Sequence, residues 1–235
     1  MTSPWWYRGR TWVFAAIFFA GFFIGGFVSG MLHHAYVPAY RELGRDLGAN
    51  GPVWMLTAAA VCAVICMILR VWGSSYLRAE IVWNPEARTD SLLVAGPFRY
   101  VRNPLYLGNV FLALGVGLMA PVAGFAVIVI GNVLLVLALA KHEEVVLEAG
   151  YGERFRAYAA QVPSLVPRLF PVPAQGDVRP SLVGGLLAEV FVAALIVGII
   201  LAFIDRQHGE IDFFVLYVAG IIAQRIIARA QQQPA

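Results

Sequence analysis

Charged side chains are scarce in this sequence. Asp, Glu, Lys and Arg make up 13% of its 235 residues, whereas 60% of the residues are hydrophobic and the mean hydropathy is +0.74. Soluble domains carry about 25% charged and about 45–50% apolar residues. The balance therefore excludes a large soluble domain and predicts an integral membrane protein. The net charge is only +3 and by itself says little about nucleic acid. For a membrane protein of this kind we expect no nucleic-acid partner.

Cysteine is nearly absent. Cys62 and Cys66 are the two cysteines, and they lie four residues apart inside one apolar run. On a helix they share a face, and this geometry does not favour a disulfide between them. No histidine or further cysteine stands nearby, so we expect two packing residues and no metal site.

Polar stretches are short, and apolar runs take up most of the chain. A helix needs about 20 residues to cross the hydrocarbon core. We therefore predict an all-α polytopic bundle of five to six spans, with the sixth run as the uncertain one. The third and fourth runs meet at Pro121 and are expected to form a tight helical hairpin. The six runs are roughly Trp12–Leu32, Val53–Trp72, Leu105–Ala120, Pro121–Ala140, Gly184–Ile204 and Ile211–Ala228.

The distribution of basic residues predicts the orientation of the bundle. If the N-terminus is cytoplasmic and all six runs cross, the inside segments carry 14 of the 17 Lys and Arg residues. Both termini and the polar segments 73–103 and 141–183 would then lie on the cytoplasmic side. The N-terminal run is too long for a signal peptide and has no small-residue cleavage site, so we expect it to be retained as a span.

The first span is rich in glycine. The patterns Gly21-x-x-x-Gly25 and Gly26-x-x-x-Gly30 place small residues one turn apart, which lets another helix approach closely. Ordinary span composition explains the same pattern nearly as well. We expect either close packing inside the bundle or a homodimer through this span.

The segment "GPFRYVRNPLYLGN", residues 96–109, precedes the third run. Pro104 suits the first turn of a helix, and Asn103 before it favours an extended or capping conformation. Free backbone N–H groups would then lie beside Arg99 and Arg102, which is a suitable site for a carboxylate or phosphate. The arginines are equally compatible with contact to lipid headgroups on the inside face.

The fourth run ends in a pair of acidic residues, Glu143 and Glu144. Adjacent carboxylates near a helix C-terminus oppose the helix dipole and repel each other, so a cationic partner is expected. It would be an arginine of the 96–109 segment or an ammonium group of a ligand. Beyond them the chain predicts an amphipathic helix interrupted near Gly150 and Gly152. The prolines of "VPSLVPRLFPVP", residues 162–173, exclude a regular helix and suggest a strap across the site.

Taken in order, these segments resemble the isoprenylcysteine carboxyl methyltransferase family and its phospholipid methyltransferase relatives. The resemblance covers about 70–171 and separates the chain into a region of two spans at 1–69, a methyltransferase core at 70–171 and a C-terminal membrane region at 172–235. Its motifs are Arg70-Val-Trp72, Leu93-Val94, Gly96-Pro97-Phe98, Arg102-Asn103-Pro104-Leu105-Tyr106-Leu107-Gly108, Glu143-Glu144 with Leu147, Tyr151-Gly152 followed by Phe155 and Tyr158, and "VPRLFP".

The resemblance implies a cofactor, S-adenosylmethionine, in a pocket open to the cytoplasm, and a lipophilic substrate that arrives from the bilayer. Two positions depart from the family pattern, since its histidine is Asn103 here and its tyrosine is Phe98. An acidic substrate needs no general base, and Arg99 or Arg102 is suited to orient it catalytically. The implied cofactor contacts are Asp90, Ser91, Leu92, Leu93, Phe98, Asn103, Pro104, Leu105, Tyr106 and one or both of Glu143 and Glu144.

Three other functions would make different demands on the sequence. A phospholipid amine would have to lose a proton before methylation, and His142 or a glutamate could accept it. A sterol-reductase-like enzyme would bind NADPH, but the chain has no recognisable dinucleotide glycine pattern. A transporter would place ionisable groups at mid-membrane, and the runs are nearly free of them. These comparisons favour a methyltransferase acting on a lipophilic carboxylate.

Overall fold

The computed structural model describes residues 4–32, 35–77, 92–175, 179–204, 215–216, 218–223 and 226–227. Asp90 and Ser91, and parts of the sixth predicted span, lie outside the described residues. The secondary structure within these ranges is helical, as expected, apart from one isolated bridge between Val94 and Gln175. Among the residues that the structure describes, three helices are long and apolar enough to cross a membrane, namely α2 (Arg10–Met31), α4 (Gly51–Tyr76) and α7 (Val122–Tyr151).

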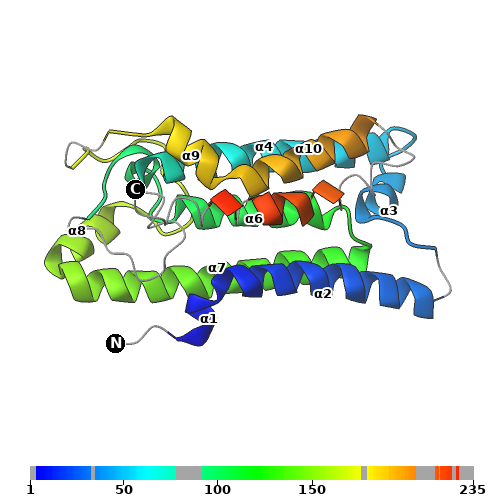
Figure 1. The fold of residues 1–235 in the computed structure, drawn as a ribbon, viewed down its shortest axis with the longest axis horizontal. Helices are drawn as coiled ribbons and strands as arrows, with labels where there is room; N and C mark the ends of the chain where they lie inside the picture. The colour runs from blue at the N-terminus through cyan, green and yellow to red at the C-terminus, as the bar shows by residue number, and fades with distance from the viewer. Residues whose placement is uncertain are drawn as a thin grey trace.

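The long helices form a layered bundle (Figure 1). Helix α2 packs along α7 on one side, and α4 packs with α9 (Leu182–Ala188) and α10 (Val190–Ile204) on the other. Between them lies α6 (Pro104–Gly117), which contacts both α4 and α7. The core is made where these three helices meet, around Ala59, Ala63, Val116 and Ile128.

Short helices lie at the two ends of the bundle. At one end, α3 (Ala39–Arg45) packs on α4. At the other are α1 (Trp5–Arg8), the 3-10 helix η1 (Gly96–Arg99) and α8 (Glu153–Gln161). The segments with the predicted site residues therefore gather at one end of the bundle (Figure 1).

The hairpin predicted at Pro121 is present, but its two helices differ greatly in length. Helix α6 has 14 residues and rises about 21 Å, which is less than the ~30 Å hydrocarbon core. Helix α7 has 30 residues and continues past Lys141 to Tyr151. Glu143 and Glu144 therefore lie inside this helix and not at its C-terminus, which corrects the sequence-based expectation. The helix ends at Gly152, whose φ of +54° suits glycine.

The close approach expected from the first span is made with α7. A Cβ added to Gly21 would lie 2.3 Å from Cγ1 of Ile128 and 2.9 Å from the Gly124 carbonyl oxygen. Gly25 faces Pro121 and Gly124 in the same way, whereas an added Cβ at Gly26 meets nothing within 4 Å. The first glycine pair is therefore used inside the bundle. The predicted homodimer remains a prediction, and Gly26 and Gly30 are the glycines left for it.

A buried ion pair connects the C-terminal helices to the rest of the bundle. Glu189, in the break between α9 and α10, is 1% exposed and accepts hydrogen bonds from Arg70 Nε at 2.6 Å and Ser74 Oγ at 2.6 Å. Arg70 also donates to Asn109 Oδ1 at 2.6 Å. This network joins α4, α6 and the α9–α10 break. It also gives the Arg70-Val-Trp72 motif a structural role.

Substitution of Gly21 by Ala should destabilise the protein, because the added methyl group overlaps Ile128 and the α7 backbone. We expect a loss of about 1–3 kcal/mol, typical of an overpacked core. Gly26→Ala is the matched control and should be neutral or stabilising by up to about 1 kcal/mol through helix propensity. Thermal unfolding in detergent measures both variants. Equal midpoints for the two would contradict the α2–α7 packing described here.

Removal of the Glu189 carboxylate should leave the Arg70 guanidinium buried without its counter-ion. Loss of one partner of a buried pair typically costs about 3–5 kcal/mol, so Glu189→Ala should unfold at a clearly lower temperature than the native chain. Glu153→Ala serves as the control because its side chain is 82% exposed. A Glu189→Ala protein as stable as this control would show that the network carries no stability.

Candidate functional site

The site is built where the chain enters α6. Asn103 precedes Pro104 with φ −121° and ψ 63°, in agreement with its predicted place at the start of the helix. Its side chain makes no capping hydrogen bond to the helix. Instead, Asn103 Nδ2 donates to Glu144 Oε1 at 3.2 Å and to Ser164 Oγ at 3.1 Å. A residue that the local sequence suggests as a cap therefore serves a tertiary contact.

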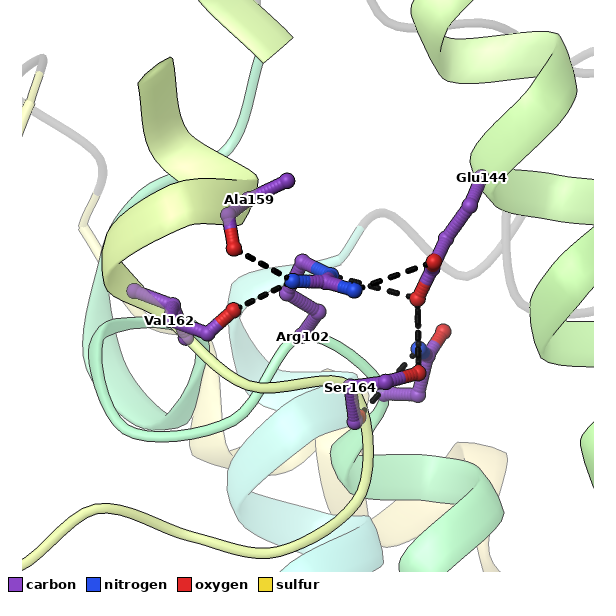
Figure 2. A network of polar contacts seen from close by, with 6 residues as sticks. Arg102, Glu144, Ala159, Val162 and Ser164 are labelled. Carbon is purple, nitrogen blue, oxygen red and sulfur yellow. Dashed lines mark hydrogen bonds and ion pairs between the residues drawn. The ribbon is translucent and has the colours of Figure 1, made fainter. Parts of the chain in front are cut away.

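Arg102 lies at the centre of the first group of contacts, which we call the Arg102 cluster and which comprises Arg102, Asn103, Glu144 and Ser164 (Figure 2). Arg102 donates from Nε and Nη2 to the two oxygens of Glu144, at 3.1 and 3.0 Å. Its Nη1 donates to the carbonyl oxygens of Ala159, at 2.8 Å, and Val162. The bidentate geometry and the backbone acceptors use most of the donors that a guanidinium offers.

The 162–173 segment lies against the chain that leads into α6. Backbone N–H groups of Arg102 and Asn103 donate to the carbonyl oxygens of Pro163 and Ser164, at 2.9 and 3.1 Å. Further along, the N–H of Val172 donates to the Arg99 carbonyl at 3.1 Å. The suggested strap is therefore present, and we call residues 162–173 the strap. It is tied by backbone hydrogen bonds, because its prolines remove some donors but none of its carbonyls.

Arg99 contacts the strap through one nitrogen. Its Nε donates to the Val172 carbonyl at 2.6 Å. Among the described residues, no hydrogen bond or ion pair involves its two terminal nitrogens. Arg99 and Arg102 thus lie in different environments, although sequence spacing presented them as equivalent. The guanidinium nitrogens of Arg102 all donate to other residues of the chain, whereas the two terminal nitrogens of Arg99 make no hydrogen bond to the described residues.

A second group of contacts surrounds the other glutamate. We call Tyr7, Tyr106, His142 and Glu143 the Glu143 cluster. Tyr106 and Tyr7 donate their hydroxyls to the same oxygen, Glu143 Oε1, at 2.6 and 3.0 Å. Within the part of the chain that the structure describes, no Lys or Arg nitrogen lies within 4.0 Å of the Glu143 carboxylate, and Oε2 accepts no hydrogen bond.

The rings of the Glu143 cluster pack closely. The Tyr7 and His142 ring centroids are 4.4 Å apart. The Trp6 and His142 ring centroids are 5.5 Å apart, in an edge-to-face arrangement. His142 Nε2 is buried and has no hydrogen-bond partner among the described residues. Burial, followed by the neighbouring Glu143 charge, raises the pKa of Tyr7, so its hydroxyl remains a proton donor at neutral pH.

The remaining predicted contact residues lie along the same stretch of chain. Pro104 and Tyr106 are buried at the start of α6, and Leu105 packs against Gly73 of α4. The Phe98 carbonyl oxygen accepts a hydrogen bond from Tyr158 at 2.7 Å, and burial raises the pKa of that tyrosine. Leu92 packs against a small core formed with Val94, Phe155 and Val172, while Leu93 is half-buried beside it.

A cavity of about 230 Å³ opens between α8 and the strap. Its walls come from Val94, Tyr158 and Val172 and from the amides of Gln161 and Gln175, with Pro173 at one side. None of these side chains carries a charge, so the cavity suits a neutral group.

Sequence reasoning missed two contributors to the site, Tyr7 and Ser164, and gave a third, His142, a limited role. Tyr7 lies about 100 residues before Tyr106, and nothing in its local pattern connects it with Glu143. Ser164 is one serine in a proline-rich segment, yet its hydroxyl donates to Glu144 Oε1 at 2.6 Å. His142 was noted only as an aid to proton transfer. A pairwise contact between distant segments has no signature in one sequence.

Comparison with known proteins agrees with the sequence-based resemblance. Residues 54–154 match the model of the family described as "Phospholipid methyltransferase". Over this segment the chain is similar to that family of membrane methyltransferases. Together with the three apolar helices found among the described residues, the match indicates an integral membrane protein related to methyltransferases. The matched segment includes Arg99, Arg102, Glu143 and Glu144.

One curated relative is the "Cobalt-zinc-cadmium resistance protein CzcN" of Cupriavidus metallidurans, which is 28% identical over 116 residues. The match covers 49% of this chain, and the chain spans about half the length of that relative. No solved structure matches the chain.

The Arg102 cluster should hold the strap in place. Arg102→Lys keeps the charge but cannot reproduce the bidentate contact with Glu144 together with both carbonyl contacts. We expect faster backbone hydrogen exchange in residues 99–103 and 162–175, measured by mass spectrometry. Arg156→Lys is the control, since Arg156 pairs at the surface with Glu148 and Glu153. If backbone exchange in Arg102→Lys is unchanged, the Arg102 cluster does not hold the strap in place.

Proposed function

We propose that the protein is an S-adenosylmethionine-dependent membrane methyltransferase that methylates a lipophilic carboxylate. The observation that carries the proposal is the contrast between the two glutamates within the family segment. Glu144 is neutralised by Arg102, whereas Glu143 has no cationic partner among the described residues. A half-buried carboxylate with no Lys or Arg nitrogen of the described residues within 4.0 Å is suited to bind an ammonium group.

The residues present fit this cofactor in charge. The amino-acid part of S-adenosylmethionine carries an ammonium group, and Glu143 Oε2 is an acceptor that the described residues leave open. Tyr7 and Tyr106 hold the other carboxylate oxygen, so the acceptor is oriented before a ligand binds. The uncharged cavity between α8 and the strap is compatible with a neutral part of the ligand.

When bound, the cofactor supplies an electrophilic methyl group on a positively charged sulfur. The acceptor must approach in line with the carbon–sulfur bond, and water must be kept away. An acceptor carboxylate is already ionised at neutral pH, because its reference pKa is near 4, and it needs no general base. Glu143 would hold the ammonium group of the cofactor, and Arg99 would hold the carboxylate that receives the methyl group, with the sulfur leaving as a neutral thioether.

Arg99 is the residue that we assign to the acceptor carboxylate. Its terminal nitrogens make no hydrogen bond to the described residues, so they are available for a bidentate contact with an acid. Arg102 has an indirect role in this proposal, since its donors are used by Glu144 and by two backbone carbonyls. It positions the strap and Glu144.

A lipid amine is the second candidate acceptor, favoured by the description of the matched family. An ammonium group would have to lose a proton before it could attack the methyl group. His142 is the group best suited to accept it, because its buried Nε2 has no partner within the described ranges. Under this alternative, His142→Gln would abolish turnover while cofactor binding is retained. If the acceptor is a carboxylate, the His142→Gln enzyme should still turn over.

Purified protein in detergent should bind S-adenosylmethionine and its demethylated product in isothermal titration calorimetry. Glu143→Gln removes the negative charge while it keeps the size of the side chain, and it should weaken binding at least about 10-fold. Glu148→Gln is the matched control, because that glutamate lies about one and a half helical turns further along α7 and is 47% exposed.

Tight NADPH binding without any response to S-adenosylmethionine would overturn the methyltransferase proposal in favour of a reductase. If the cofactor binds, mass spectrometry of lipids and lipid-linked peptides incubated with the enzyme would identify the acceptor, by the mass gain of one methyl group that replaces one hydrogen.

A further inference from the structure

The N-terminal helix α1 contributes a side chain to the candidate site although it lies outside the matched family segment. Residues 54–154 match the family, whereas α1 spans Trp5–Arg8. Tyr7 is 7% exposed and belongs to the buried group that includes Tyr106, Leu139 and Ala140. Helix α1 is therefore docked on α6 and α7 at the level of Glu143.

The Tyr7 contact with Glu143 is specific in its geometry. The hydroxyl donates to Oε1 at 3.0 Å, and the ring lies against His142 with centroids 4.4 Å apart. The Arg10 guanidinium carbon lies 5.1 Å from the centre of the same ring, within the range of a cation–π contact. The ring is thus held by neighbours on α2 and α7, which limits the positions open to the hydroxyl.

Both hydroxyl donors act on one oxygen of the carboxylate. With Tyr7 and Tyr106 on Oε1, the carboxylate plane is restrained and Oε2 is the oxygen that remains. A single hydroxyl would leave the group free to rotate about its donor, and a ligand would then have to order it at an entropic cost. Tyr7 therefore supplies a restraint that Tyr106 alone does not.

We propose that Tyr7 is a positioning residue of the cofactor site, which orients the Glu143 carboxylate for the ammonium group of the cofactor. The proposal rests on the function proposed above. It goes beyond that function because it makes the N-terminal helix, which the family match does not cover, a part of the binding site.

The test is a double-mutant cycle on cofactor binding. Tyr7→Phe removes the hydroxyl alone and keeps the ring, and we expect S-adenosylmethionine to bind about 5- to 10-fold more weakly, as one hydrogen bond to a charged group is lost. In a Glu143→Gln background, Tyr7→Phe should weaken binding by less than about 2-fold, because the negative charge that Tyr7 orients toward the ammonium group is already removed. A purely structural role would weaken binding equally in both backgrounds.

Tyr36→Phe is the matched control. That tyrosine donates its hydroxyl to the Met119 carbonyl at 3.0 Å, at the opposite end of α6 from Tyr106. It should leave cofactor affinity unchanged. Thermal unfolding of the cofactor-free proteins in detergent should give similar midpoints for Tyr7→Phe and Tyr36→Phe, which separates positioning from general destabilisation.

Each outcome of the cycle decides a definite point. If the native protein binds and Tyr7→Phe binds equally well or more tightly, the role of Tyr7 is overturned and the proposed function stands. Equal losses in both backgrounds also overturn it, because Tyr7 would not act through Glu143. If the native protein does not bind S-adenosylmethionine at all, the proposed function and the role of Tyr7 fall together.

Discussion

The bidentate pair between Arg102 and Glu144 is the contact on which the site depends, since it joins segments that no helix brings together by itself. Arg102 stands just before α6, Glu144 lies on α7, and the carbonyls of Ala159 and Val162 belong to the end of α8 and the start of the strap. A guanidinium can make these contacts at once because its planar donors point in several directions. Four parts of the chain converge on one side chain as a result.

Neutralisation of Glu144 has a consequence for its neighbour. Two adjacent carboxylates repel each other when both are charged and unpaired. Once Glu144 is paired with Arg102, Glu143 can stay in a half-buried environment where its hydrogen-bond donors from the described residues are tyrosine hydroxyls. The same pair of residues thereby provides one structural carboxylate and one that is open to a ligand. This division of roles depends on their directions around α7, because successive helical residues project about 100° apart.

The remainder of the bundle shows how a membrane protein places its few charges. Arg70 and Glu189 are buried together with Ser74 and Asn109, so each charge has a counter-charge and hydrogen-bond partners. Unpaired, either would be costly in an apolar environment. Close helix contacts at Gly21 and Gly124 bring α2 against α7 and carry α1 to the level of Glu143. The position of Tyr7 thus follows from packing much further along the helix.

The sequence by itself determined the membrane class, the positions of the main helices, the hairpin at Pro121, the strap and the family resemblance, because hydrophobic length, proline and glycine act locally. The tertiary structure alone decided how Arg99 differs from Arg102 and Glu143 from Glu144, since adjacent or near-adjacent residues of one type are indistinguishable until their partners are known. It also extended α7 beyond Lys141 and brought Tyr7 and Ser164 to the glutamates. Those contacts join residues far apart in the chain, and their energy comes from a geometry that local propensity does not encode.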